Sequence, residues 1–222
     1  MRSAAAFALS LALASMAGPV RSEDAGTAKA LTLEALLERM RSSAGVAAEF
    51  NERKELALLS EPLESRGRLY FAAPDRLARF TSEPVFSALI IDGDAVRFRE
   101  GEDEALDLSG DPVARRFVEN FIVLWSGDRG RLERLYRVEL SAEGERWRLS
   151  LAPRGAPLDA VIDRIELRGD RQRLLEMVVR DRDGDRTITA FGAVDMDRTF
   201  SAPELERLFE KGLPLDTATG TR

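Results

Sequence analysis

The spacing of apolar residues changes along the chain, and this change separates predicted helices from predicted strands. Between Leu33 and Met40 the apolar residues recur every three or four positions, which is typical of one buried helix face. Thr32 can cap this helix, which is expected to end near Gly45. The same spacing returns later and predicts two further helices, one from Pro112 to just before Gly127 and one over 203–209.

The remaining segments are short runs with the composition and alternation of strands. Turn dipeptides such as Asp92-Gly93 and Asp183-Gly184 separate them, as in an antiparallel meander. No internal repeat or linker interrupts the series, so residues 23–222 are expected to form a single domain with a loose tail over 212–222. About ten strands are expected, over 46–59, 67–71, 77–82, 86–91, 95–99, 135–140, 147–151, 160–167, 174–180 and 187–195.

Residues 1–22 have the layout of a secretory signal peptide. Arg2 supplies a positive charge, an apolar run follows over 4–18, and small or aliphatic residues precede a possible cleavage site after Ser22. The run is shorter than the about 20 residues that a permanent membrane span needs. We therefore predict that residues 1–22 are removed on export. A disordered or membrane-anchoring tail is the alternative.

The composition excludes most common catalytic machinery, because the chain has no Cys and no His. Disulfides, thiol nucleophiles, His-based triads and His-ligated metals are therefore ruled out. The formal net charge is −6 and becomes more negative when Arg2 and Arg21 leave with the signal peptide. An acidic exported protein is a poor candidate for binding nucleic acid or an anionic membrane surface.

The acidic clusters do not match a known ligand spacing. In the segment 181–185 the glycine falls at the fourth position, whereas a calcium loop of the helix–loop–helix type needs it at the sixth. A solvated Asp-Gly turn is therefore preferred there, and a surface loop is preferred for the acidic run 100–104. With no phosphate loop and no marked carboxylate pair, we expect no metal, no cofactor and no enzymatic activity. A hydrolase that uses carboxylates stays open as a third functional class.

Large apolar side chains on the strands and on the middle helix are the most informative signal. They either fill a packed core or line an apolar chamber that holds a ligand. Periodicity alone does not distinguish these two interpretations. The residues are Phe50, Leu69, Phe71, Phe80, Leu89, Ile91, Phe98, Phe117, Phe121, Trp125 and Trp147.

The order of several short motifs resembles the periplasmic outer-membrane lipoprotein carrier (LolA-like) family, from about Leu33 to Phe209. An opening helix is followed by Val-Ala-Ala-Glu-Phe at 46–50 and by Gly-Arg-Leu-Tyr-Phe at 67–71, which runs into Pro74. Ile-Ile-Asp-Gly at 90–93, Leu-Ala-Pro-Arg at 151–154 and Met-Val-Val-Arg-Asp at 177–181 come next. No single motif is specific, and the resemblance rests on their order and spacing.

This resemblance implies a mainly β (α+β) fold, an unclosed and strongly curved antiparallel β-barrel with a helical lid. It also implies a monomeric periplasmic carrier whose interior receives acyl chains of a lipoprotein or lipid. The cargo would come from an inner-membrane exporter and pass to an outer-membrane acceptor, which is itself anchored through a Cys that this chain lacks. The alternative is a periplasmic sensor or regulatory binding module on the same fold. The expected lipid-binding residues are Phe50, Leu69, Phe71, Leu77, Arg79, Leu89, Ile91, Phe98, Phe117, Phe121, Leu124 and Trp125, with Phe117, Phe121 and Leu124 on the lid.

The chain departs from the family pattern at several positions. Ala73 stands where the family commonly has an arginine before the proline, and Leu77-Ala78-Arg79 replaces its Phe-x-Trp. We hypothesise that Arg79, and also Arg97 or Arg99, meets an anionic head group of the cargo. The alternative is that each arginine reaches solvent along its apolar stem.

Overall fold

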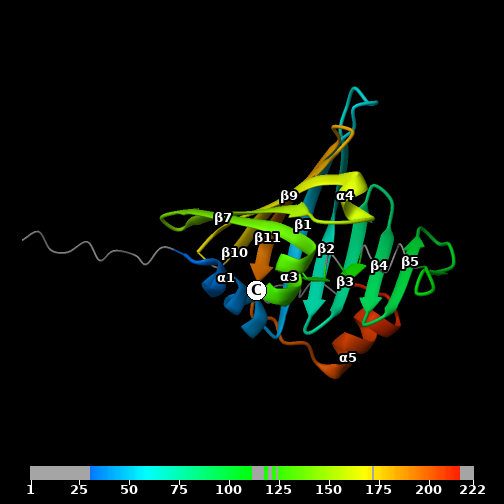
Figure 1. Ribbon diagram of the computed structural model, residues 1–222. Helices are drawn as coiled ribbons and strands as arrows, with labels where there is room; N and C mark the ends of the chain where they lie inside the picture. Colours follow the sequence, from blue (N-terminus) through cyan, green and yellow to red (C-terminus); the bar gives the residue numbers. More distant parts are fainter. Residues whose placement is uncertain (1–30, 112–117, 120–121, 124, 172, 216–222) are drawn as a thin grey trace, which may run out of the picture.

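Eleven antiparallel strands form one continuous sheet in the order β6-β5-β4-β3-β2-β1-β11-β10-β9-β8-β7 (Figure 1). The computed structural model describes residues 31–111, 118–119, 122–123, 125–171 and 173–215. The predicted signal peptide therefore lies outside the described residues. The strands are β1 Gly45–Glu55, β2 Leu63–Ala72, β3 Arg76–Glu83, β4 Ser87–Asp92, β5 Ala95–Glu100, β6 Leu106–Asp107, β7 Tyr136–Glu143, β8 Arg146–Pro153, β9 Ile162–Asp170, β10 Arg173–Asp181 and β11 Arg186–Asp195.

The pairing of β1 with β11 joins the two halves of the chain. In all other neighbouring pairs of the sheet, the two strands are consecutive in sequence, as expected for a meander. The sheet does not close, because β6 and β7 stand at its two ends. The prediction of an unclosed, mainly β antiparallel fold with helices is confirmed, and the short strand β6 is an addition to the expected set.

The sheet curves strongly around one face, which we call the concave face. A single apolar cluster on this face joins Ile91 of β4, Phe50 of β1 and Leu149 of β8. These strands are far apart in the strand order, so their side chains meet only if the sheet bends around them. Figure 1 shows β7 and β9 running across the direction of β2 to β5.

The helix α1, Leu33–Ser42, closes one end of this concave face. Its predicted cap is present, because the Ala35 N–H donates a hydrogen bond of 3.2 Å to Thr32 Oγ1. Leu36, Leu37 and Met40 are buried in the concave cluster, as their spacing predicts. We call this the α1 end of the sheet, and the opposite end, where β1 turns into β2, the hairpin end.

Two short helices were not expected. Leu135, the predicted start of a strand, belongs to α3, Arg129–Leu135, and residues 160–161, also expected in a strand, belong to α4, Leu158–Val161. Both expectations were wrong because helices of one or two turns are too short to show a helical period. Of the predicted helix that starts at Pro112, residues 118–119, 122–123 and 125–126 are helical, and 112–117, 120–121 and 124 lie outside the described residues.

The C-terminal segment covers the opposite face of β2 to β5, which we call the outer face. It comprises α5, Ala202–Leu205, and a π-helical turn η1, Glu206–Glu210. Leu208 and Phe209 of η1 are buried against Tyr70, Phe80 and Ile90 of the sheet. Among the described residues, no helix has the length and apolar character needed to cross a membrane.

The expectation of a loose tail from 212 onward was wrong for residues 212–215. Leu213 N donates to the Arg207 carbonyl at 2.9 Å, and Arg207 Nε donates to the Pro214 carbonyl at 2.8 Å. Arg68 of β2 donates to the Leu215 carbonyl at 2.9 Å. The tail is therefore tied to the sheet through residue 215, and the rest of it lies outside the described residues.

Candidate functional site

Side chains on the concave face form rows that cross the sheet from strand to strand. The row at the α1 end is apolar and buried throughout. Cross-strand pairing places its members side by side, in the order Val46, Phe71, Leu77, Ile91 and Val96 from β1 to β5.

The rows become more polar toward the hairpin end. The next row contains Ala48, Leu69, Arg79, Leu89 and Phe98. In the third row, Phe50 pairs with Gly67, and Gly67 pairs with Thr81. In the row beyond it, Glu52 pairs with Ser65. The concave face of β1 to β3 therefore changes from apolar to charged along the strand direction.

A cavity of about 430 Å³ opens over these rows. Trp125 and Val118, from the segment after β6, face the sheet across it. Seven of the predicted lipid-binding residues line this cavity: Phe50, Leu69, Leu77, Arg79, Leu89, Ile91 and Trp125. Their association with lipid remains a prediction.

Five predicted residues are not among the cavity lining. Phe71 is buried beneath it and stacks on Trp125, with ring centroids 6.5 Å apart. Phe98 lies beside Leu89 across the β4–β5 pair. Phe117, Phe121 and Leu124, the predicted lid residues, lie outside the described residues.

Arg97 and Arg99, the other two arginines of the head-group hypothesis, are not among the residues that line the cavity. Both side chains lie on the outer face of β5, because they alternate with Val96 and Phe98. Arg97 donates to the carbonyls of Phe209 and Glu210, and Arg99 donates to the carbonyl of Gly212 at 3.5 Å. The Arg99 guanidinium also lies 5.1 Å from the centre of the Phe86 ring. These arginines therefore fasten the C-terminal segment to the sheet.

The sequence predictions missed nine lining residues, and five of them come from the far half of the chain. Alternation along β10 and β11 marks Met177 and Val179, and Thr187, Thr189 and Phe191, as sharing a face on each strand. Without the β1–β11 pairing, the sequence does not show that this face adjoins Phe50. The missed lining residues are Glu52, Val96, Leu108, Val118, Met177, Val179, Thr187, Thr189 and Phe191.

An ion pair is built into the wall of the cavity. Arg79 Nη2 lies 3.0 Å from Glu52 Oε1, and the two side chains are 29% and 23% exposed. Thr189 donates its hydroxyl hydrogen bond to Glu52 Oε2 at 3.0 Å. The Arg79 guanidinium also lies 4.3 Å from the centre of the Phe50 ring, which adds a cation–π contact. The predicted site residue Arg79 thus lines the cavity and is neutralised by Glu52.

Gly67 makes room for this arrangement. An added Cβ would lie 2.8 Å from Phe50 Cζ and 1.9 Å from the Phe80 carbonyl oxygen. Only a residue without a side chain leaves that space to the Phe50 ring, on which the Arg79 guanidinium rests.

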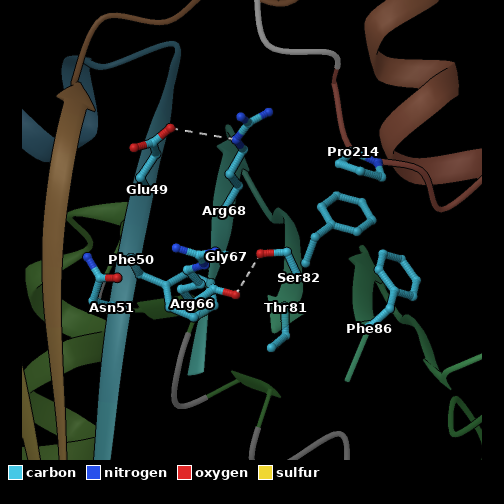
Figure 2. A pocket seen from close by; sticks show the side chains of 11 residues that line it. Glu49, Phe50, Asn51, Arg66, Gly67, Arg68, Thr81, Ser82, Phe86 and Pro214 are labelled. Carbon is cyan, nitrogen blue, oxygen red and sulfur yellow. Dashed lines mark hydrogen bonds and ion pairs between the residues drawn. The ribbon is translucent and has the colours of Figure 1, made fainter. Parts of the chain in front are cut away.

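A second pocket, of about 600 Å³, lies on the other side of β1 to β3 (Figure 2). Figure 2 shows Glu49 and Arg68 beside it, and Pro214 of the C-terminal tail at its edge. Arg68 Nε lies 3.8 Å from Glu49 Oε1. Six of the eleven residues that line this pocket are polar or charged. It therefore offers an acyl chain less apolar surface than the concave cavity does.

The acidic segment 181–185 is the turn between β10 and β11, as preferred from its sequence. The carboxylates of Asp181, Asp183 and Asp185 lie within 4.8 Å of one another. Burial, and then repulsion from Asp183, raises the pKa of Asp181 above its ordinary value. In the acidic run 100–104, Glu100 is the last residue of β5, and residues 101–104 lie in the largely exposed connection to β6, again as preferred.

Two curated relatives of this chain are outer-membrane lipoprotein carrier proteins. An outer-membrane lipoprotein carrier protein from Chromohalobacter salexigens is 26% identical over 215 residues, covering 93% of this chain and 99% of the relative. Another from Hahella chejuensis is 23% identical over 151 residues, covering 68% of this chain and 69% of the relative.

Among solved structures, a LolA superfamily protein from Nitrosomonas europaea covers 78% of this chain and 96% of its own, with 11% identity and a TM-score of 0.43. The family model described as "Outer membrane lipoprotein carrier protein LolA-like" matches residues 25–211. This match spans most of the chain, and the chain therefore belongs to the LolA-like family of outer membrane lipoprotein carrier proteins.

Proposed function

We propose that this protein is a periplasmic carrier that encloses an acyl chain of a lipoprotein or lipid in the concave cavity and moves it from the inner to the outer membrane. The observation that carries the proposal is the cavity of about 430 Å³, whose lining is mostly aliphatic and aromatic. Membership of the carrier family and the predicted signal peptide support the same conclusion.

The size of the cavity limits the cargo that it can enclose. Its volume falls within the range of roughly 300–1,000 Å³ that is typical of small-molecule sites. A methylene group is close in size to a water molecule, whose share of liquid volume is about 30 Å³, so the cavity holds roughly a dozen methylenes. One acyl chain fits within it, and further chains of the same cargo would need additional space.

The energetics suit a carrier. Each buried methylene contributes about 0.8 kcal/mol, so enclosing one chain is worth on the order of 10 kcal/mol before the costs of ordering are subtracted. Such a gain keeps the acyl chain bound in the cavity while the carrier is surrounded by water. It still permits transfer of the acyl chain to an acceptor with its own apolar site. Because transfer in this scheme requires no bond to be made or broken, we propose a binding function rather than catalysis. An inner-membrane exporter and an outer-membrane acceptor would set the direction.

The cavity can be filled by mutation to test the proposal. Val179 lies half-buried on the cavity wall, and Val179→Trp would occupy part of the volume that the acyl chain needs. We expect the mature wild-type protein, purified from its own periplasm, to carry acyl-chain lipid that mass spectrometry detects after solvent extraction. We expect Val179→Trp to lose most of it, which corresponds to a weakening of binding by more than about tenfold.

Leu175→Trp is the matched control. Leu175 is on the same strand, is 38% exposed and is not among the lining residues. The control should retain wild-type amounts of lipid, and thermal unfolding should show that both variants fold. If wild-type protein carries no lipid and binds no apolar fluorescent probe, or if both variants keep the lipid equally, the proposed carrier site is wrong.

A further inference from the structure

Charge is concentrated at one place in an otherwise apolar cavity. Among the described residues that line it, Glu52 and Arg79 are the charged ones, and Thr187 and Thr189 add hydroxyls beside them. A partly buried ion pair contributes little to stability compared with apolar side chains of similar size. Stability therefore does not explain why the pair lies in the wall of the proposed lipid-binding cavity, and a role in ligand binding would explain it.

The pair offers a ligand both signs of charge with no net charge. Glu52 Oε2 accepts a hydrogen bond from Thr189, while Oε1 faces the Arg79 guanidinium at 3.0 Å. Arg79 Nη2 is buried and makes no well-aligned hydrogen bond, although it lies only 3.0 Å from Glu52 Oε1. A buried N–H group in this condition costs free energy until an acceptor aligns with it. A ligand oxygen beside Arg79 would meet that need.

The position of the pair orients the ligand. Leu77 and Ile91 lie in the buried row toward the α1 end, whereas Arg79 and Glu52 lie progressively closer to the hairpin end. An amphiphile therefore places its chain toward Trp125 and Ile91 and its head at the ion pair. In this orientation the chain is enclosed and the head lies nearest the polar part of the sheet.

We propose that Glu52 and Arg79 form a head-group subsite that selects an amphiphile whose head carries no net charge and has both a hydrogen-bond acceptor and a donor. This inference rests on the proposed carrier function and specifies its cargo class. The hydrogen-bond acceptor of the ligand's head group aligns with Arg79, and the hydrogen-bond donor of the same head group contacts Glu52. An anionic head gains little from Arg79, which Glu52 already neutralises, and it is repelled by the Glu52 carboxylate.

Four single-chain amphiphiles with the same acyl length test the selection. Monoacylglycerol and lysophosphatidylethanolamine have heads without net charge, and the fatty acid and lysophosphatidylglycerol have anionic heads. Each is titrated below its micelle concentration against wild-type protein loaded with an apolar fluorescent probe. We expect the first two to displace the probe at concentrations about tenfold lower than the anionic pair.

Glu52→Gln should abolish this preference. The substitution leaves the charge of Arg79 uncompensated, so the anionic amphiphiles should gain about tenfold in affinity, with the affinity of the probe measured separately for each variant. Glu83→Gln is the matched control, because it removes the same charge from an exposed pair with Arg66 outside the cavity lining. It should leave the order unchanged.

Thr189→Val is a second variant in case Glu52→Gln does not fold. It keeps the shape of the side chain and removes the hydroxyl that holds Glu52, so discrimination between heads should weaken. Equal binding of all four amphiphiles by wild-type protein, or an order that Glu52→Gln leaves intact, overturns the subsite and leaves the carrier function standing. Failure of the probe and of every amphiphile to bind overturns both.

Discussion

Gly67 shows how a single residue controls the cavity wall. The Phe50 ring occupies the space where a side chain at position 67 would lie, and the Arg79 guanidinium rests on that ring. The contact between Arg79 and Glu52 therefore depends on a residue that has no side chain of its own. The sequence shows each of these residues separately, but the register between β1, β2 and β3 brings them together.

Gly67→Ala is expected to destabilise the protein by about 1–3 kcal/mol, the usual cost of overpacking a well-packed site. The added Cβ meets the Phe80 carbonyl, a backbone atom that cannot rotate away. Urea unfolding measures the loss. Gly192→Ala on β11 is the control, because its Cβ would meet nothing within 4 Å. Equal stability of the two variants would contradict the close packing described at Gly67.

At the scale of elements, alternation and turn residues were sufficient to locate most strands. Residues 77–82 and 95–99, for example, fall within β3 and β5. Alternation did not identify neighbours that are distant in sequence: Thr189 and Glu52 are 137 positions apart and still share a hydrogen bond. The short helices α3 and α4 were missed because tertiary packing, rather than a long apolar period, stabilises them.

An ion pair links α1 to the segment after β11, and we expect its contribution to stability to depend on pH. Arg39 of α1 donates two hydrogen bonds, of 2.7 and 2.6 Å, to Asp197 in the segment after β11. The Arg39 hydrogen bond lowers the pKa of Asp197 below its ordinary value of 3.8. Because the pKa is lower in the folded state, this pair stabilises the protein above the unfolded pKa, and the contribution is lost as the pH falls through the folded value.

We expect Asp197→Asn to lower the urea midpoint at about pH 6. Its effect should shrink as the pH falls below 3.8, because the unfolded chain then takes up a proton before the folded ion pair does. Asp94→Asn, in the exposed β4–β5 turn, controls for the removal of a surface charge. A difference between wild type and Asp197→Asn that stays constant across this pH range would show that the ion pair does not fasten α1.

At the scale of the whole molecule, one sheet serves two purposes. Its outer face is covered by α5 and η1, held by Leu208, Phe209 and Arg97. Its concave face holds a packed cluster near α1 and a cavity farther along the strands. The sequence left a filled core and a lined cavity as alternatives. The described residues contain both, because the same strands pass from buried apolar positions to polar ones along their length.

The two tryptophans of the chain therefore lie in different environments, one beside the cavity and one away from it. Trp125 lines the cavity, with its ring centre 6.0 Å from that of Phe191. Trp147 is buried on β8 beside Gly169 and is not among the lining residues. An acyl chain that enters the cavity should therefore change the polarity around Trp125 and leave Trp147 as it was.

We expect a single-chain amphiphile to shift the tryptophan emission of wild-type protein and of Trp147→Phe by similar amounts. Trp125→Phe should give little shift while still binding the amphiphile, which mass spectrometry of the intact complex measures independently. A shift that disappears in Trp147→Phe would place the ligand near β8. Because Trp125 contacts Phe191 of β11 and stacks on Phe71 of β2, a shift at Trp125 would locate the acyl chain where the two halves of the sheet meet.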